Sequence, residues 1–507
     1  MRDKIIFWLD ADLIHFGIAK YLQENYECDL FAVIDITNKP KKFFEKQKII
    51  NFNKVWFYHD YLQNLKKPDL NYLSNFEKKY HLNFWEMLNN DRIFFQYNDY
   101  YKYSEEQILS ILERECKLFE SILDEFKPDF LVIHETALRQ QHLFHQMCRA
   151  RGIKVLMLNY SNFGQRTYIS QDYHKLDYIE NLEVLKDTNR SFNDLENLLK
   201  SDKASERIMN FYKKYQNSSL DKFKAAIQFL IKSDNSNIKT HYTYFGRTRI
   251  RVLIKEAIYS LKKIYRESFV NKNLHYHLDE HEPFVFFPLH QEPERSLLLS
   301  APFSNHQLEI IQQIVKSLPI GYKLYVKEHP TQGKGRGWRP ISVYKQIMDL
   351  PNVKLIHPSV NSNKIFPRCS MVISISGTSC FEAAFYQKPS IVLADEGYTI
   401  LPSVIRLKSF EDLPNAIQLA LKTVVNVTDV DKYVTFIENN SFNFDYPSFV
   451  AVYHKWFYFS GNLVDIEISE SRMESFLKEE KTRFEQLALE HIKKIKQHKE
   501  FDHKYSK

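Results

Sequence analysis

Residues 326–330, VKEHP, could hold a phosphate group. An apolar strand ends there in Lys327, Glu328 and His329, and Pro330 stops it. Ligands of open α/β sheets bind beyond the carboxyl ends of strands, where His329 could donate to a phosphate oxygen and Lys327 could add positive charge. Together they could stabilise a departing nucleoside phosphate without a metal ion. An exposed loop with an incidental histidine is the alternative.

A second segment, residues 372–393, reads VISISGTSCFEAAFYQKPSIVL and predicts a strand, a turn, a helix and a strand. Ser376, Gly377, Thr378 and Ser379 form the turn, and the N–H groups at the start of the next helix could bind phosphate. Glu382 lies three residues into that helix. It could complete a capping box with Ser379 or accept hydrogen bonds from ribose hydroxyls.

Polar residues also follow an apolar strand in FFPLHQEPERS, residues 286–296. His290, Gln291 and Glu292 predict a cleft floor or a contact with a donor sugar, and an exposed charged loop is the alternative.

Glycine is scarce, with 11 residues, and six of them lie between positions 321 and 397. The glycines at 333, 335 and 337 are spaced two apart, so they do not form a dinucleotide-binding fingerprint. With Lys334, Arg336 and Arg339 they predict either a flexible basic flap over donor phosphates or a plain surface loop.

The N-terminal half offers five candidates for a base that accepts a proton from an acceptor hydroxyl. They stand at or just after the ends of predicted strands: Asp10, Asp12, His15, His134 and Glu135. Asp10 or Asp12 could instead cap the following helix, and His134 could be a satisfied core residue. The sequence does not choose among these roles.

The elements that position these residues alternate as in a parallel α/β sheet. In the first half we expect strands at 4–9, 31–36, 130–133 and 154–158, with helices at 16–24 and up to about 151. In the second half we expect a strand in PFVFFP, a helix at 307–317, strands at 323–327, 353–356 and 371–374, a helix at 379–386 and a strand at 390–394. Residues 174–275, and the chain after about 405, are expected to be helical.

A chain of 507 residues is too long for one core, and its 44% hydrophobic and 26% charged residues are ordinary for a globular protein. We therefore expect an N-terminal domain at 1–175, a helical connector at 176–280, a C-terminal domain at 281–430, and helices with a charged tail at 431–507. No apolar run is long enough to span a membrane, which predicts a cytoplasmic protein. The five scattered cysteines suggest neither a disulfide framework nor a zinc site.

Residues 221–273 carry twelve lysines and arginines against four acidic residues, whereas the whole chain has a net charge of only +7. Apolar residues recur among them at helical spacing. This predicts either a basic amphipathic helix on anionic lipid or polymer, or the solvated face of a packed helix. A membrane contact would place the protein on the inner face of the cytoplasmic membrane. No nucleic-acid motif accompanies the charge.

The segments FPLHQEPERS, YVKEHP, NVKLIHPSVNS and SISGTSCFEAAFYQKPSIVL resemble, in order and spacing, the capsule polysaccharide biosynthesis proteins, including those similar to bacterial Kdo transferases. The resemblance covers roughly residues 281–405. It implies a GT-B arrangement, two Rossmann-like domains facing across a cleft, with the activated nucleotide sugar on the C-terminal one. It also implies that His329 and Pro330 form a phosphate-binding pair, and that Ser376–Ser379 with Glu382 form a nucleotide-binding turn.

Together these features predict a metal-independent glycosyltransferase without a cofactor. The donor is expected to be a CMP-linked acidic sugar such as Kdo, with a UDP-sugar as a second choice, and the acceptor a capsule or other surface polysaccharide. Three alternatives stay open. They are a nucleotide-sugar 2-epimerase, a teichoic-acid-type polyol-phosphate transferase, and a non-catalytic module that binds polysaccharide or scaffolds an export complex.

Overall fold

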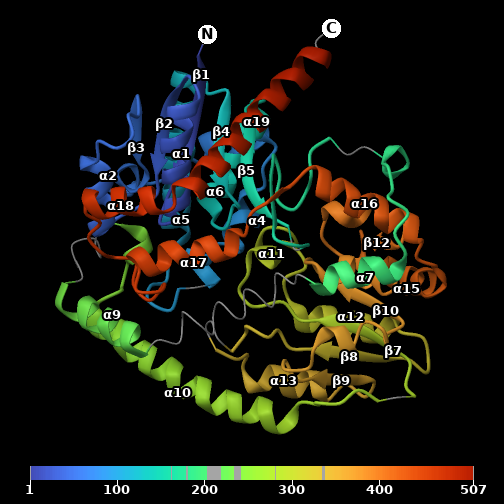
Figure 1. The fold of residues 1–507 in the computed structure, drawn as a ribbon. Coiled ribbons are helices and arrows are strands. Elements are labelled where there is room, and N and C mark those ends of the chain that lie inside the picture. Colours follow the sequence, from blue (N-terminus) through green and yellow to red (C-terminus); the bar gives the residue numbers. More distant parts are fainter. Residues whose placement is uncertain are drawn as a thin grey trace. The chain divides into compact units, whose positions relative to one another are not determined.

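The computed structural model describes residues 2–96, 98–161, 163–178, 181–201, 219–232, 241–279, 281–333 and 337–505. The chain divides into two compact α/β units, each with its own sheet (Figure 1). Unit 1 comprises Met1–Asp177, Lys203–Arg249 and Ser441–Lys507, and unit 2 comprises Tyr178–Asp202 and Ile250–Asn440.

Unit 1 contains a seven-stranded sheet in the order β13-β6-β5-β4-β1-β2-β3. Strands β1 to β5 pair in parallel, whereas β6 and β13 add antiparallel pairs at one edge. The strands are β1 (Asp3–Leu9), β2 (Cys28–Ile34), β3 (Lys54–Phe57), β4 (Phe130–His134), β5 (Lys154–Tyr160), β6 (Arg166–Ser170) and β13 (Phe442–Asn443).

Helices cover both faces of this sheet, because alternate residues of β1 enter two separate cores. Ile5 and Phe7 pack on one side, and Ile6 and Trp8 on the other. The first side is covered by α1 (Leu13–Asn25), α2 (Asn38–Lys46), α17 (Tyr446–Phe457), α18 (Glu470–Glu479) and α19 (Lys481–Tyr505). The second is covered by α3 (Leu70–Tyr80), α4 (Phe84–Asn89), α5 (Glu105–Phe126) and α6 (Arg139–Ala150).

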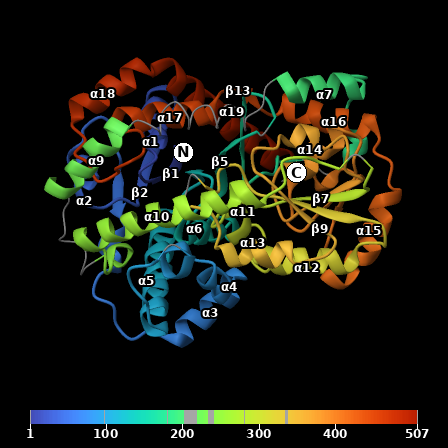
Figure 2. The ribbon, with the colours of Figure 1, turned by 90° about the horizontal axis from the view of Figure 1, so that it is seen from below.

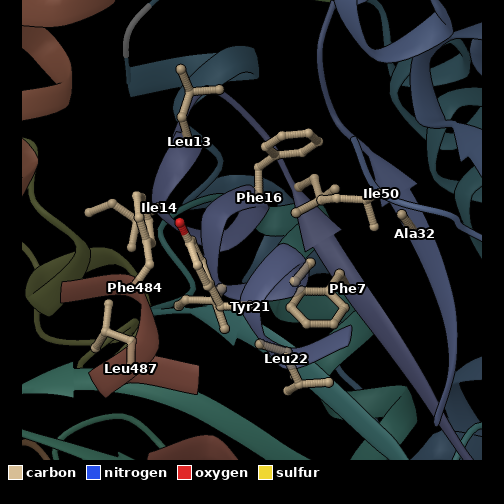
Figure 3. Close-up of a cluster of buried hydrophobic side chains, with 14 of the residues drawn as sticks. Phe7, Leu13, Ile14, Phe16, Tyr21, Leu22, Ala32, Ile50, Phe484 and Leu487 are labelled. Carbon is tan, nitrogen blue, oxygen red and sulfur yellow. The ribbon is translucent and has the colours of Figure 1, made fainter. Parts of the chain in front are cut away.

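The last helix, α19, belongs to the core of unit 1. Its residues Phe484 and Leu487 are fully buried beside Ile14 and Tyr21 of α1 (Figure 3). Gly17 permits this close approach, because a Cβ atom built on it would lie 2.1 Å from Cε1 of Phe484. The C-terminal helices therefore complete the domain that the first residues of the chain begin.

Unit 2 contains six parallel strands in the order β12-β11-β10-β7-β8-β9. They are β7 (Phe284–Pro288), β8 (Lys323–Lys327), β9 (Val353–Ile356), β10 (Met371–Ser374), β11 (Ser390–Val392) and β12 (Val404–Arg406). The helices are α7 (Phe192–Ser201), α10 (Arg249–Asn273), α11 (Arg295–Leu298), α12 (Gln307–Ser317), α13 (Ile341–Met348), α14 (Ser379–Phe385), α15 (Leu413–Lys422) and α16 (Val427–Asn439). Buried residues of α12, α13 and α15 join those of the sheet in one core.

Unit 1 also has the helix α9 (Ser219–Lys232) and the short helical turns η1 (Tyr58–Leu62), η2 (Arg92–Gln96) and η5 (Tyr242–Tyr244). Unit 2 has η3 (Leu182–Val184), η6 (Ser362–Lys364), η7 (Gly397–Ile400) and η8 (Phe410–Asp412).

The predicted fold class is confirmed: there are two Rossmann-like units, a helical middle segment and a helical C-terminal segment. The described parts of residues 176–280 form helices, and they are shared between the two units. Helix α12 and strands β8, β9 and β10 have the expected bounds. Strands β3, β6, β12 and β13 were not expected; β3, β12 and β13 are short edge strands, and β6 lies between β13 and β5.

Candidate functional site

In unit 2, three neighbouring strands end close together and place polar residues at one edge of the sheet. Strand β7 lies between β10 and β8, and all three run parallel. His290, just after β7, accepts a hydrogen bond at its Nε2 from the backbone N–H of Ser376, just after β10, at 3.3 Å. The same Nε2 lies 3.2 Å from Oγ of Ser374. Two of the three predicted polar segments therefore meet here.

Lys327, the last residue of β8, brings a buried positive charge to this edge. Its side chain is only 4% exposed, and the described part of the chain offers its ammonium group no hydrogen-bond or ion-pair partner. Burial lowers the pKa of Lys327 to about 8, although the charges of Glu328 and Glu382 oppose the shift. A buried ammonium group without a protein partner is suited to binding an anion.

His329 follows on the same strand end and is held as a neutral donor. Its Nδ1 accepts from the Thr331 backbone N–H at 3.3 Å and lies 2.8 Å from Oγ1 of Thr331, so the ring proton stays on Nε2. Burial, together with the charges of His290, Lys327 and Arg339, lowers the pKa of His329 to about 3. His329 can therefore donate one hydrogen bond to a phosphate oxygen at neutral pH, as the sequence predicts.

The turn after β10 is held by contacts with residues that follow β11. Ser376 donates to Glu396, and the hydroxyl of Tyr398 donates to the carbonyl of Gly377. Gly377 has φ +102°, and a Cβ atom there would lie 3.2 Å from Cε1 of His290. This close approach and the left-handed backbone both require glycine.

The expected capping box between Ser379 and Glu382 is wrong. The N-cap of α14 is Thr378, whose hydroxyl donates to Oε1 of Glu382 at 2.7 Å. Helix α14 begins one residue earlier than a Ser379 cap would require, because Ser379 is already its first residue and Thr378 has helical dihedral angles. The proposed contact of Glu382 with ribose stays a prediction.

Arg339 is wrongly predicted as part of a surface flap, because it is 4% exposed and its guanidinium lies inside unit 2. It contacts Glu328 through Nε at 2.9 Å and Glu292 through Nη1 at 2.7 Å, and it donates to the carbonyl of His290. Burial opposes its charge, but the two glutamates outweigh that effect and raise the pKa of Arg339. Tyr344 adds a 2.7 Å hydrogen bond to Glu328. The remaining flap residues, 334–336, lie outside the described part of the chain.

Gln291 and Glu292 brace the strand ends. Gln291 accepts from Oγ1 of Thr331 at 2.7 Å, and Glu292 pairs with Arg339. The Glu292 backbone N–H donates to Gln332 at 2.9 Å. These contacts join the loop after β7 to the loop after β8.

In unit 1, Asp10 and His134 form a close pair at the ends of β1 and β4. Nε2 of His134 lies 2.7 Å from Oδ2 of Asp10, and Gln141 donates to the same oxygen at 2.9 Å. Nδ1 of His134 lies 2.6 Å from the carbonyl oxygen of Glu135. Burial lowers the pKa of His134, but Asp10 and Asp12 outweigh it and raise that pKa to about 10. His134 is therefore an imidazolium that orients Asp10 at neutral pH.

The other candidates of unit 1 have distinct environments. Asp12 caps α1 by accepting from the Ile14 backbone N–H at 2.9 Å, and it also accepts from Tyr446 at 2.6 Å. His15 is fully buried, which lowers its pKa well below the usual range. Glu135 is partly buried, and its Oε2 forms no hydrogen bond. Among the five candidates, Glu135 is the one with an unused carboxylate oxygen.

Several contacts of these sites, and two of their residues, were not predicted. His290, Glu328 and Arg339 lie in segments that the sequence marks as polar, but their mutual contacts join loops far apart in the chain. Glu396 was not predicted, because Asp395 and Glu396 follow β11 without a recognisable motif. Gln141 lies in the first turn of α6 and looks like an ordinary surface residue in the sequence.

No group of three or more His, Cys, Asp or Glu side chains within the described residues is arranged to hold a metal ion. Among the described helices, none is both long and apolar enough to cross a membrane.

The fold and the polar strand ends thus define a two-unit α/β protein with a candidate anion site in unit 2. Residues 184–401 match the family model described as capsule polysaccharide biosynthesis protein. This match confirms the resemblance to capsule polysaccharide biosynthesis proteins and extends it from about residue 281 back to residue 184. No curated protein matches the chain.

The solved structures that match the chain include three kinds of enzyme. UDP-GlcNAc 2-epimerase from Methanocaldococcus jannaschii is 12% identical, with 87% of this chain and 99% of that chain covered and a TM-score of 0.26. An α,α-trehalose-phosphate synthase from Burkholderia vietnamiensis is 9% identical, with 88% and 97% covered and a TM-score of 0.28. Thermosulfurimonas dismutans KpsC, a β Kdo 2,4 transferase, is 14% identical, with 61% and 87% covered and a TM-score of 0.28.

Proposed function

We propose that the protein is a glycosyltransferase that moves a sugar from a nucleotide-activated donor to a capsule or other surface polysaccharide. The main support for this function is the group of polar residues at the ends of β7, β8 and β10 in unit 2. It combines the unpaired ammonium of Lys327 with the neutral Nε2–H donor of His329. The family match over residues 184–401 supports the capsule polysaccharide as the product.

In the proposed reaction, an acceptor hydroxyl oxygen forms a bond to the anomeric carbon of the donor sugar. The bond between that carbon and the phosphate oxygen breaks, and its electron pair leaves with the nucleoside phosphate. Lys327 and His329 stabilise the negative charge that develops on this phosphate. The proton of the acceptor hydroxyl passes to a carboxylate of unit 1.

Glu135 is the proposed proton acceptor. Its Oε2 forms no hydrogen bond, whereas Asp10 already accepts from His134 and Gln141, and Asp12 caps α1. A carboxylate with a free lone pair is the stronger candidate for a general base. His134 is unsuited to this role, because both of its ring nitrogens face oxygen acceptors.

We propose a CMP-linked acidic sugar such as Kdo as donor, with a UDP-sugar as the second choice, and catalysis without a metal ion or cofactor. Lys327 supports an anionic donor, because its charge would otherwise stay unpaired inside unit 2.

The test uses CMP-, UDP- and GDP-sugars labelled in the sugar, with and without oligosaccharides prepared from the surface polysaccharide of the producing cells. We expect label to appear in the oligosaccharide with one nucleotide class. Glu135→Gln should lower the rate by about 100-fold or more, as expected for loss of a general base. Conversion of a free nucleotide sugar without acceptor would instead indicate an epimerase. Transfer of a polyol phosphate would indicate the teichoic-acid type, and binding without turnover a non-catalytic module.

We also propose that the protein works in the cytoplasm and attaches to an anionic membrane surface through α10, the long yellow-green helix in Figure 2. Six apolar side chains on one arc of this helix are between 44% and 72% exposed: Ile250, Ile254, Ile258, Leu261, Ile264 and Tyr265. The helix also carries seven lysines and arginines against two glutamates. An exposed apolar arc with basic flanks is typical of helices that lie in a membrane interface. Residues 233–240 of the predicted basic segment lie outside the described part of the chain.

A further inference from the structure

One side chain of α6, that of Gln141, joins the loop after β4 to the loop after β1 in unit 1. Its Oε1 accepts from the backbone N–H of Ala137 at 2.9 Å and from that of Leu138 at 3.0 Å. Its Nε2 donates to Oδ2 of Asp10 at 2.9 Å. Strands β1 and β4 are neighbours in the sheet, so the amide connects two adjacent strand ends.

These contacts fix the direction in which the amide of Gln141 points. Backbone N–H groups only donate, so the amide atom that faces Ala137 and Leu138 must be the oxygen. The nitrogen then faces the carboxylate of Asp10, which accepts. Gln141 is 1% exposed, and a buried amide with partners for both of its polar atoms is held in one orientation.

Part of this arrangement is an ordinary helix cap. Gln141 is the third residue of α6, and a glutamine at that position commonly bonds back to the backbone N–H of the N-cap, here Leu138. The bond to Asp10 has no part in capping, because Asp10 lies 131 residues earlier in the chain. Gln141 therefore links two separate loops in addition to capping its own helix.

The loop that Gln141 holds carries Glu135, the proposed proton acceptor. The carbonyl oxygen of Glu135 lies 2.6 Å from Nδ1 of His134, and the N–H groups two and three residues further on bond to Gln141. Oε2 of Glu135 forms no hydrogen bond within the described part of the chain. Contacts to the backbone of this loop therefore determine where that oxygen lies.

We propose that Gln141 is a positioning residue for proton transfer, because it holds the loop of Glu135 and the carboxylate of Asp10 in one arrangement. It acts through Glu135. This inference rests on the proposed function, in which Glu135 accepts the proton of the acceptor hydroxyl. A reacting group displaced by about 1 Å can lower a rate on the order of 100-fold, so loss of Gln141 should slow transfer and leave donor binding intact.

Gln140 offers a matched control in the same turn of α6. It is 2% exposed, and its Nε2 donates to Oδ2 of Asp35 at 3.0 Å, as that of Gln141 does to Asp10. Its Oε1 has no hydrogen-bond partner among the described residues. Replacing Gln140 therefore removes one buried amide bond to an aspartate without releasing the loop of Glu135.

The test measures transfer of labelled sugar by the full chain over a range of donor concentrations. Gln141→Ala should lower kcat about tenfold or more and leave the donor KM within about twofold of the wild-type value. Gln141→Met, which keeps the buried volume, should behave in the same way, and Gln140→Ala should keep the wild-type kcat. In a Glu135→Gln background, Gln141→Ala should lower kcat further by less than about twofold, because its effect passes through Glu135.

Wild-type activity of Gln141→Met would overturn this role. Equal fractional losses from Gln141→Ala in the wild-type and Glu135→Gln backgrounds would also overturn it, because they would indicate a general disturbance of unit 1. The same holds for a loss as large in Gln140→Ala, or for a loss that lies wholly in the donor KM. Failure of the proposed function is distinct, because the wild type itself would then transfer no sugar from any nucleotide donor.

Discussion

The pair formed by Asp10 and His134 shows how one residue fixes the charge of another. Two oxygens, one from a carboxylate and one from a backbone carbonyl, face the two ring nitrogens of His134. Each nitrogen is therefore best satisfied when it carries a proton, and the imidazolium is stabilised although the ring is buried. His134 and Gln141 together hold the Asp10 carboxylate in place.

This arrangement predicts the protonation of His134. With its pKa raised to about 10, both ring nitrogens should remain protonated at pH 8. The stability that this pair gives unit 1 should be complete below pH 6.5 and be lost as pH rises towards 10, by on the order of 3 kcal/mol. Nitrogen-15 NMR of histidine-labelled protein checks the first point, with His134→Gln to assign the signal. Thermal unfolding between pH 6 and 10 checks the second, and a neutral ring at pH 8 would contradict the account.

At the scale of elements, the contact between α1 and α19 joins the two ends of the chain. The face of α19 towards α1 is apolar, and Gly17 lets the ring of Phe484 approach the backbone of α1. A glycine inside a helix is normally unfavourable compared with alanine. Here the packing of the ring offsets that disadvantage.

Gly17→Ala should therefore destabilise unit 1 by about 2 kcal/mol, because the new Cβ would overlap the ring of Phe484. In a Phe484→Ala background the same change should become stabilising, since the clash is gone and alanine favours the helix. Thermal unfolding, with hydrogen exchange of the α1 amides to identify unit 1, measures both values. A Gly17→Ala effect of the same sign and size in both backgrounds would refute this contact.

The elements that the sequence predicts best are those with local signals. The segment VKEHP contains both its strand and the polar residues at its end, and the helix at 307–317 has clear periodicity. Arg339 was misjudged because its burial depends on Glu328, on a different element. Asp35 and His59 follow different strands and lie 2.9 Å apart, and the sequence gives no sign of their contact. Non-local pairing of this kind is fixed by sheet order, which short motifs do not encode.

At the scale of the whole molecule, α10 predicts how the protein meets a membrane. The full chain should co-sediment with vesicles of phosphatidylglycerol and phosphatidylcholine, and less with phosphatidylcholine alone. Binding should weaken as salt rises from 0.05 to about 0.5 M, because part of it is electrostatic. Leu261→Glu should reduce the bound fraction about fivefold or more by placing a charge in the apolar arc.

Ile320→Glu is the matched control, because Ile320 is a fully exposed apolar residue of unit 2 away from α10. It should bind vesicles as the wild type does. Equal loss in both variants, or binding that ignores salt and lipid charge, would remove the membrane role of α10.

The central claim is that unit 2 binds the phosphate of a nucleotide donor through Lys327. Calorimetric titration of CMP, UDP and GDP tests it most directly, with Lys316→Met as a control at an exposed position. We expect one nucleotide to bind the wild type and the control equally, and Lys327→Met to lose about tenfold or more in affinity. Since the pKa of Lys327 is about 8, wild-type affinity should fall between pH 7 and 9, whereas that of Lys327→Met should not. Unchanged affinity in Lys327→Met, or no binding of any of the three nucleotides, would contradict the account.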